Sequence, residues 1–216
     1  MVTDSRIDRL LGTSLVSTAA GIVTARHLRV PAYHGVPDPT AFRRQLELLA
    51  RHYRPVTGAQ VADAVGGGAA LGPRALWVTF DDGCADVVDA GMAELDRVGV
   101  PATMFVCPGL VHERRPFWWS QVTAALADGP YTYAGRTWTD RSLVVHLKGV
   151  DDDERRRVVD DLARRSPAPA DVVASVLTVD QARRWLDAGH ELGNHTWDHP
   201  CLDQCDDAEQ ERQVRS

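Results

Sequence analysis

The clearest indication of the fold lies in residues 75–83, ALWVTFDDG. The first six residues are mainly apolar and partly β-branched, which is typical of a buried strand, and Asp81-Asp82-Gly83 then forms a turn. Both carboxylates are therefore expected at the carboxyl end of a strand.

Outward from this stretch, helix and strand signals alternate along the chain. Helical periodicity runs from Val87 to Val98 and stops at Gly99, and a second apolar strand is expected over residues 102–106. Further elements are predicted as strands over 28–33 and 190–193 and as helices over 39–53 and 178–188. This order predicts an α/β fold with parallel strands, in which functional groups gather where strands end.

Residues 114–170 interrupt the alternation with helical, strongly charged sequence. Helices are expected over 118–127, 140–148 and 151–165, and the last begins with acids and ends with arginines, as the helix dipole favours. We interpret this segment as a helical insertion in a domain that spans residues 28–216. Residues 1–27 are expected to form an N-terminal helical extension.

The composition is that of a folded domain without a basic footprint. The chain has 216 residues, 44% of them hydrophobic, and a net charge of −6 with both signs interspersed, so nucleic acid is not an expected partner. The uncharged stretch 10–25 is too short and polar for a transmembrane segment, and Asp4 and Asp8 weaken a signal-peptide interpretation. A cytoplasmic location is expected, with association with the cell envelope as the alternative, and the oligomeric state stays open.

Four cysteines, at positions 84, 107, 201 and 205, are too few for a disulfide framework and are expected to be reduced. Their spacing argues against a four-cysteine zinc site. Packing is the simpler role for Cys84 and Cys107, although both follow predicted strands.

Two histidines stand four residues apart in residues 195–199, HTWDH. On a helix this spacing places both on one face, where they can share a metal ion. Two imidazoles and one carboxylate from residues 81–82 would leave positions for water and substrate, while the second aspartate accepts the proton of that water. The same donors describe the facial triad of iron oxygenases, an alternative that the second aspartate and the helical insertion disfavour.

These residues resemble the polysaccharide deacetylases, carbohydrate esterase family four, with their NodB-like domain. Residues 79–83, TFDDG, look like the first family motif, and residues 195–199 fit the second. Similarity to a bacterial subgroup that modifies exported or cell-surface glycans extends to residues 33–34, 99–106, 116–119 and 188–193. The resemblance covers about residue 28 to the C-terminus.

The resemblance implies a distorted TIM-like (β/α) barrel and removal of acetyl groups from N-acetylated sugars of a glycan. It assigns Asp82, His195 and His199 as ligands of a divalent metal, with zinc as the first expectation, and Asp81 as the general base. Thr196 is given either a role in orienting a ligand or a purely local turn role.

The family pattern continues with an arginine-proline segment, an aspartate-tryptophan segment and a leucine-x-histidine segment that supplies the general acid. The residues after His199 contain none of these. The resemblance therefore predicts a partial barrel whose C-terminal strands are missing. An inactive remnant, or a carbohydrate-binding protein that retains the metal motifs, is the alternative to an active enzyme.

Three other features receive structural interpretations. His34 is expected to be a satisfied structural histidine, and His112 and His146 are expected on the surface. Trp118 and Trp119 would suit stacking on a sugar ring, but at the start of an amphipathic helix they more often belong to the core.

Overall fold

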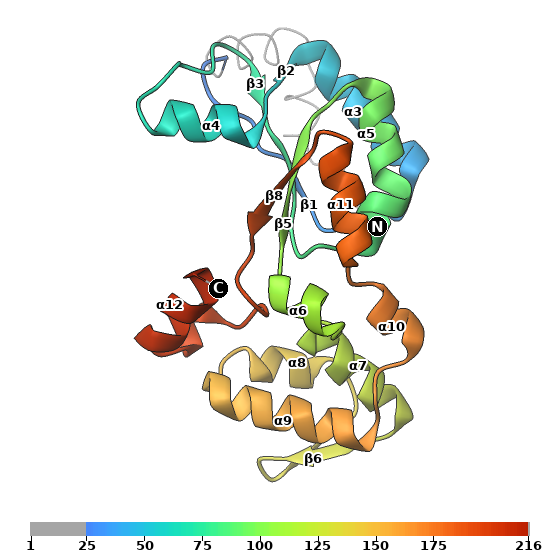
Figure 1. The fold of residues 1–216 in the computed structure, drawn as a ribbon. Helices are drawn as coiled ribbons and strands as arrows, with labels where there is room; N and C mark the ends of the chain where they lie inside the picture. Colours follow the sequence, from blue (N-terminus) through green and yellow to red (C-terminus); the bar gives the residue numbers. More distant parts are fainter. Residues whose placement is uncertain (1–24, 216) are drawn as a thin grey trace, which may run out of the picture.

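The computed structural model describes residues 25–215, which form an α/β unit and a smaller, mostly helical unit (Figure 1). The predicted helical extension over 1–27 lies outside the described residues, apart from residues 25–27, which form a turn. Within residues 25–215, no helix has both the length and the apolar character needed to cross a bilayer.

A four-stranded parallel sheet forms the centre of the α/β unit. Its strands are β1 (Ala32–Tyr33), β4 (Val78–Phe80), β5 (Ala102–Val106) and β8 (Glu191–Asn194), in the order β1-β4-β5-β8. Every adjacent pair is parallel, with Thr79 opposite Thr103 and Met104 opposite Leu192. The predicted α/β class with parallel strands is therefore confirmed, and these four strands form an open sheet.

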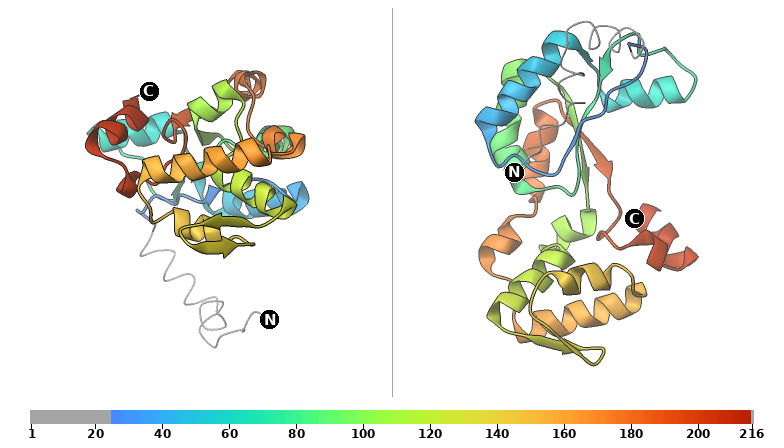
Figure 2. Two further views of the ribbon diagram at one scale, coloured as in Figure 1. Left: turned by 90° about the horizontal axis from the view of Figure 1, so that it is seen from below. Right: turned by 180° about the vertical axis from the view of Figure 1, so that it is seen from behind.

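Three helical segments cover one face of this sheet (Figures 1 and 2). They are α3 (Pro39–His52), the π-helical turn η1 (Val87–Gly91) continuing into α5 (Met92–Val98), and α11 (Val179–Asp187). Local signals set their ends: Asp38 caps α3, Thr178 and Gln181 form a capping box on α11, and Gly99 ends α5 at φ +71°.

The main core lies between these helices and the sheet. Phe80 of β4 packs edge to face on Trp185 of α11, with ring centroids 5.9 Å apart, and both side chains are fully buried. Leu46 of α3 and Leu95 of α5 complete the same cluster. The alternating strands and amphipathic helices therefore bury their apolar residues as their patterns predicted.

The mostly helical unit lies between β5 and α11 in the chain. It contains α7 (Trp118–Asp128), α8 (Ser142–Leu147) and α9 (Asp152–Arg165), with a separate core that includes Trp118, Leu143 and Leu162. Helices are present where the sequence predicted them. That this segment is an insertion, and that residues 28–216 form one domain, remain predictions.

This unit also holds an antiparallel hairpin, β6 (Tyr131–Tyr133) and β7 (Arg136–Trp138), that the helical interpretation missed. Ala134 and Gly135 form its two-residue turn with φ of +51° and +72°. Positive φ at both turn positions suits the twist of a hairpin. Gly135 was the residue in the sequence that could have indicated this turn.

The remaining elements are short. They are β2 (Arg54–Pro55), α4 (Gly58–Val65), β3 (Ala75–Leu76), α6 (Pro108–Glu113), α10 (Ala170–Ala174), η2 (Leu202–Gln204) and α12 (Asp207–Arg215). The strand predicted over 28–33 is shorter than expected, because only Ala32–Tyr33 and an isolated bridge at Arg29 pair with neighbours. Pro31 lacks the N–H that a continuous ladder requires.

Candidate metal centre

The acidic pair and the two histidines come together at the carboxyl edge of the parallel sheet. Asp81 and Asp82 follow β4, and His195 follows β8. The strand ends are also joined directly, because His195 N donates to Val106 O and Asp81 N donates to Tyr33 O, each at 2.8 Å. The parallel topology thus brings together residues more than a hundred positions apart in the sequence.

One carboxylate oxygen faces both imidazoles. Asp82 Oδ1 lies 3.3 Å from His195 Nε2 and 3.1 Å from His199 Nε2. One ligand atom from each of the three residues lies within 4.8 Å of the other two. The imidazole side chains are 32% and 31% exposed, whereas Asp82 is buried. The cluster is therefore accessible from the histidine side.

The donor set fits a divalent cation. Asp82 Oδ1 is buried, yet no group in residues 25–215 donates a hydrogen bond of acceptable geometry to it. A buried carboxylate oxygen without a hydrogen bond is costly unless a cation compensates it. Two imidazole nitrogens and one carboxylate oxygen are ligands that zinc accepts in sites with an open position.

The two histidines lie on an irregular loop, so the helical-face argument for their spacing is wrong. Thr196 and His199 adopt positive φ, +68° and +59°, and the chain turns between them. Thr196 Oγ1 accepts a hydrogen bond from His199 N at 3.1 Å, which holds this turn. Asp82 also has positive φ, +74°. Such strained backbone is common at functional sites.

The charges of the three residues reinforce one another. Burial raises the pKa of Asp82, but the contacts with His195 and His199 lower it by more, so its pKa lies well below the ordinary value. The contact with Asp82 raises the pKa of His195, burial opposes this, and the charge of Asp81 contributes a further increase. Asp82 is therefore an anion at neutral pH.

Comparison with known proteins agrees with this arrangement. The family model described as polysaccharide deacetylase matches residues 68–216, which include both motifs and the three clustered side chains. The chain belongs to the polysaccharide deacetylase family. The family resemblance inferred from the sequence is thereby confirmed. No curated protein matches the chain significantly.

A solved deacetylase structure shares the fold. The Streptococcus pyogenes deacetylase PplD in complex with acetate is 16% identical, with a TM-score of 0.53, over 87% of this chain and 63% of that chain. A de-N-acetylase from Aggregatibacter actinomycetemcomitans is 19% identical, with a TM-score of 0.46, over 79% of this chain and 55% of that chain. This polysaccharide deacetylase chain thus spans less than two thirds of the length of either structure.

Aromatic side chains of the helical unit border the cluster in this family member. Trp118 Nε1 donates to His199 O at 3.1 Å. The Trp119 ring centroid lies 4.8 Å from that of His199, and its face stacks on Phe117 at 4.7 Å. Trp118 is buried in the core of the helical unit, as predicted, whereas Trp119 is half-buried.

No cysteine of the described residues belongs to the cluster of three. Cys107 is buried and its Sγ donates to His195 O at 3.3 Å. Burial raises the pKa of Cys107 and also raises that of Cys84, to about 12, so both thiols stay protonated. All four cysteines are free. The packing role predicted for Cys84 and Cys107 agrees with these contacts.

The other histidines lie outside the cluster of three. His112 and His146 are exposed, as predicted. His34 is exposed as well, so the prediction of a satisfied structural histidine is wrong. Pro37 and Asp38, which follow the first strand, are also exposed, and this part of the chain therefore offers little burial to His34.

Sequence reasoning missed the polar residues that hold the histidine loop. Asp198, between the two histidines, is buried and pairs with Arg156 of α9 and Gln213 of α12. Arg156 is the middle one of three consecutive arginines, and no local signal distinguishes it from a solvated surface residue.

Proposed function

We propose that this chain acts as a metal-dependent hydrolase that removes acetyl groups from N-acetylated sugars of a glycan. The observation that carries the proposal is the approach of Asp82 Oδ1 to both imidazole Nε2 atoms, with Asp81 as its chain neighbour. Family membership supports hydrolysis over iron-dependent oxygenation. The structural neighbours named as deacetylases point to the same class of reaction.

In this proposal Asp82, His195 and His199 hold the cation. When bound, a divalent cation acidifies a water molecule and polarises an acetyl carbonyl. Asp82 contributes negative charge from a buried position, and the imidazole nitrogens of His195 and His199 would complete the set. Zinc is the proposed metal because it accepts histidine and carboxylate ligands and tolerates an open coordination position.

Asp81 is the proposed general base. Its backbone is fixed on both sides, because Asp81 N donates to Tyr33 O and Asp81 O accepts from Gly83 N at 2.9 Å. Its half-buried carboxylate accepts the proton that the attacking water gives up. Glycan would approach from the side on which the two imidazoles are exposed.

The experiment measures acetate release from N-acetylglucosamine oligomers by the chain, loaded with zinc or cobalt and after chelation. We expect release only from the loaded protein. Asp81→Asn should keep the wild-type zinc affinity and lose turnover by about a hundredfold or more. Asp82→Asn should lose both zinc affinity and turnover. Asparagine tolerates the positive φ at this position, so the backbone should not be disturbed.

Two outcomes would contradict the proposal. If zinc affinity is unchanged in both Asp82→Asn and His199→Gln, these residues do not form a metal site. Tight zinc binding without acetate release from any N-acetylated oligomer would replace the hydrolase by a glycan-binding role, which binding measurements with the same oligomers would then test.

A further inference from the structure

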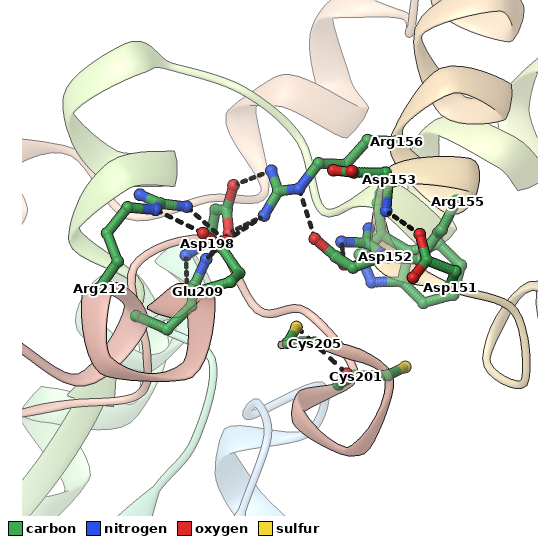
Figure 3. A network of polar contacts seen from close by, with 12 residues as sticks. Asp151, Asp152, Asp153, Arg155, Arg156, Asp198, Cys201, Cys205, Glu209 and Arg212 are labelled. Atoms are coloured by element: carbon green, nitrogen blue, oxygen red, sulfur yellow. Dashed lines mark hydrogen bonds and ion pairs between the residues drawn. The ribbon is translucent and has the colours of Figure 1, made fainter. Parts of the chain in front are cut away.

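Asp198 stands between the two clustered histidines in the sequence and is buried. Arg156 and Gln213, from two distant segments, hydrogen-bond to it, and Arg115 Nη2 lies 3.6 Å from its Oδ2. The Asp198 side chain is 5% exposed. Arg156 of α9 forms a two-pronged ion pair with it, Nη1 to Oδ2 at 2.6 Å and Nη2 to Oδ1 at 3.0 Å (Figure 3). Planar, bidentate pairing of this kind fixes orientation as well as distance.

Gln213 of α12 also holds Asp198. The Gln213 amide is fully buried, donates from Nε2 to Asp198 Oδ1 at 2.6 Å, and accepts from Asp198 N at its Oε1 at 3.1 Å. One side chain therefore binds both the backbone and the carboxylate of Asp198. The two contacts restrain the position of the loop and the direction in which it runs.

Arg156 connects this loop to two helices at once. Beyond Asp198, its Nε donates to Asp152 Oδ2 at 2.6 Å within α9, and its Nη2 donates to Glu209 Oε1 of α12 at 3.0 Å (Figure 3). Glu209 in turn accepts from Gln213 Nε2 at 2.9 Å. The guanidinium thus joins three carboxylates from three segments.

The histidine loop depends on such external contacts. Residues 195–199 form neither helix nor strand, and two of them have positive φ. A buried ion pair contributes little net stability, because desolvation offsets most of the Coulombic gain. The pair can still affect geometry, because Asp198 lies between the two histidines in the sequence. Rotation of Asp198 would move the backbone that carries both imidazoles.

We propose that Arg156 and Gln213 are positioning residues for the metal centre, because they fix Asp198 and thereby hold His195 and His199 in the arrangement that faces Asp82. The inference rests on the proposed function, because these residues affect catalysis only if the centre binds a catalytic metal. It concerns residues of the helical unit and of α12, outside the two sequence motifs.

The test compares Arg156→Met, Arg156→Lys and Gln213→Leu with the matched control Arg157→Met, an exposed arginine one residue further along α9. The readouts are zinc affinity, the visible spectrum of the cobalt-loaded protein, and amide hydrogen exchange of residues 195–199 without metal. Far-UV circular dichroism and urea unfolding check that each variant is folded.

We expect Arg156→Met and Gln213→Leu to weaken zinc binding by about tenfold or more, which is typical for partners that orient metal ligands. Arg156→Lys should recover part of the affinity, because the ammonium keeps the charge and loses the planar fork. The cobalt spectrum should change, and exchange should accelerate at residues 195–199. Arg157→Met should match the wild type in every readout.

Folded variants whose zinc affinity and cobalt spectrum stay within about twofold of Arg157→Met would overturn the inference. If Arg156→Met does not fold, Gln213→Leu decides, because it replaces a neutral side chain and leaves the Arg156–Asp198 pair intact. If the wild type binds no zinc, the proposed function fails, and hydrogen exchange still decides the positioning role: unchanged exchange at residues 195–199 would refute it.

Discussion

The indole of Trp118 donates a hydrogen bond to the carbonyl oxygen of His199 at 3.1 Å. This contact joins the first residue of α7, in the helical unit, to the backbone of a clustered histidine in the α/β unit. The guanidinium of Arg155 lies over the same ring, with its Cζ 5.1 Å from the ring centroid. The helical unit thus contacts the histidine loop at two points, at His199 O through Trp118 and at Asp198 through Arg156.

Trp118→Phe should weaken zinc binding by about tenfold, because it removes a group that fixes the backbone of a ligand. It should also cost about 1 kcal/mol in the free energy of unfolding. Trp138→Phe is the matched control: that indole donates to Tyr133 O at 3.1 Å in the same core and has no contact with His195 or His199 among the ring contacts and hydrogen bonds of the described residues. Equal zinc affinities in the two variants would contradict the prediction.

Gly109→Ala should disturb the histidine loop, although alanine usually favours a helix. A Cβ at Gly109 would lie 2.5 Å from Nε1 of Trp197, the residue midway between the two histidines. Overpacking of this kind costs about 1–3 kcal/mol, and zinc affinity should fall with it. Unfolding and zinc titrations measure both effects, and Gly149→Ala, whose nearest contact would be 3.7 Å, is the control.

The double variant Gly109→Ala/Trp197→Leu distinguishes a steric cause from a general weakening of α6. Leucine removes the ring that the new methyl group would meet. Zinc affinity should recover relative to Gly109→Ala alone. No recovery would show that the contact between positions 109 and 197 is not the cause.

Glu191→Gln should destabilise the fold by about 1–2 kcal/mol at neutral pH, because it removes an anion from a helix N-terminus. The Glu191 carboxylate accepts from Ala59 N at 2.9 Å and Thr103 Oγ1 at 2.8 Å, and also from Gly58 N. It therefore joins β8 to β5 and to the start of α4.

The same residue predicts a dependence of stability on pH. Burial raises the pKa of Glu191, but these donors lower it by more, so its pKa in the folded protein lies below the ordinary value. Its contribution is present above the unfolded pKa and is lost as pH falls through the folded pKa. Urea unfolding at neutral and acidic pH should show a smaller acid loss in Glu191→Gln than in the surface control Glu47→Gln, whose side chain is 44% exposed. An equal loss would contradict this.

His190→Phe should reduce the loss of stability on mild acidification. His190 is buried and stacks on Trp185 at 4.2 Å, and burial lowers its pKa although Asp96 raises it. As pH falls, this histidine is protonated in the unfolded chain before it is protonated in the folded protein. The free energy of unfolding therefore falls below about pH 6.5, by at most about 1.4 kcal/mol per pH unit. Phenylalanine keeps a planar ring and does not titrate.

Urea unfolding between about pH 5 and pH 7 measures this slope for the wild type and the variant. His146→Phe is the control, because that histidine is exposed, 4.9 Å from the ring of Trp138. The prediction fails if His190→Phe and the wild type lose stability in parallel over this range.

Local sequence patterns were sufficient for the regular elements and for the two motifs. The apolar run before Asp81 is extended but divides into β3 and β4, which belong to different sheets. The periodic segments 39–53 and 151–165 are helices within one or two residues of their predicted ends. These features depend on neighbours a few positions away, which the sequence displays directly. The hairpin around Gly135 was missed because its strands are only three residues long.

The shape of the candidate metal centre was decided by tertiary structure. The sequence placed His195 and His199 four residues apart, but their convergence on Asp82 arises from a loop with positive φ that follows β8, beside β5. The contacts of Asp198 with Arg156 and Gln213 span 42 and 15 residues. Sequence alone therefore determined most of the regular elements and the residues proposed for the site. Packing between distant segments decided their orientation, because hydrogen-bond geometry depends on the position of every partner in space.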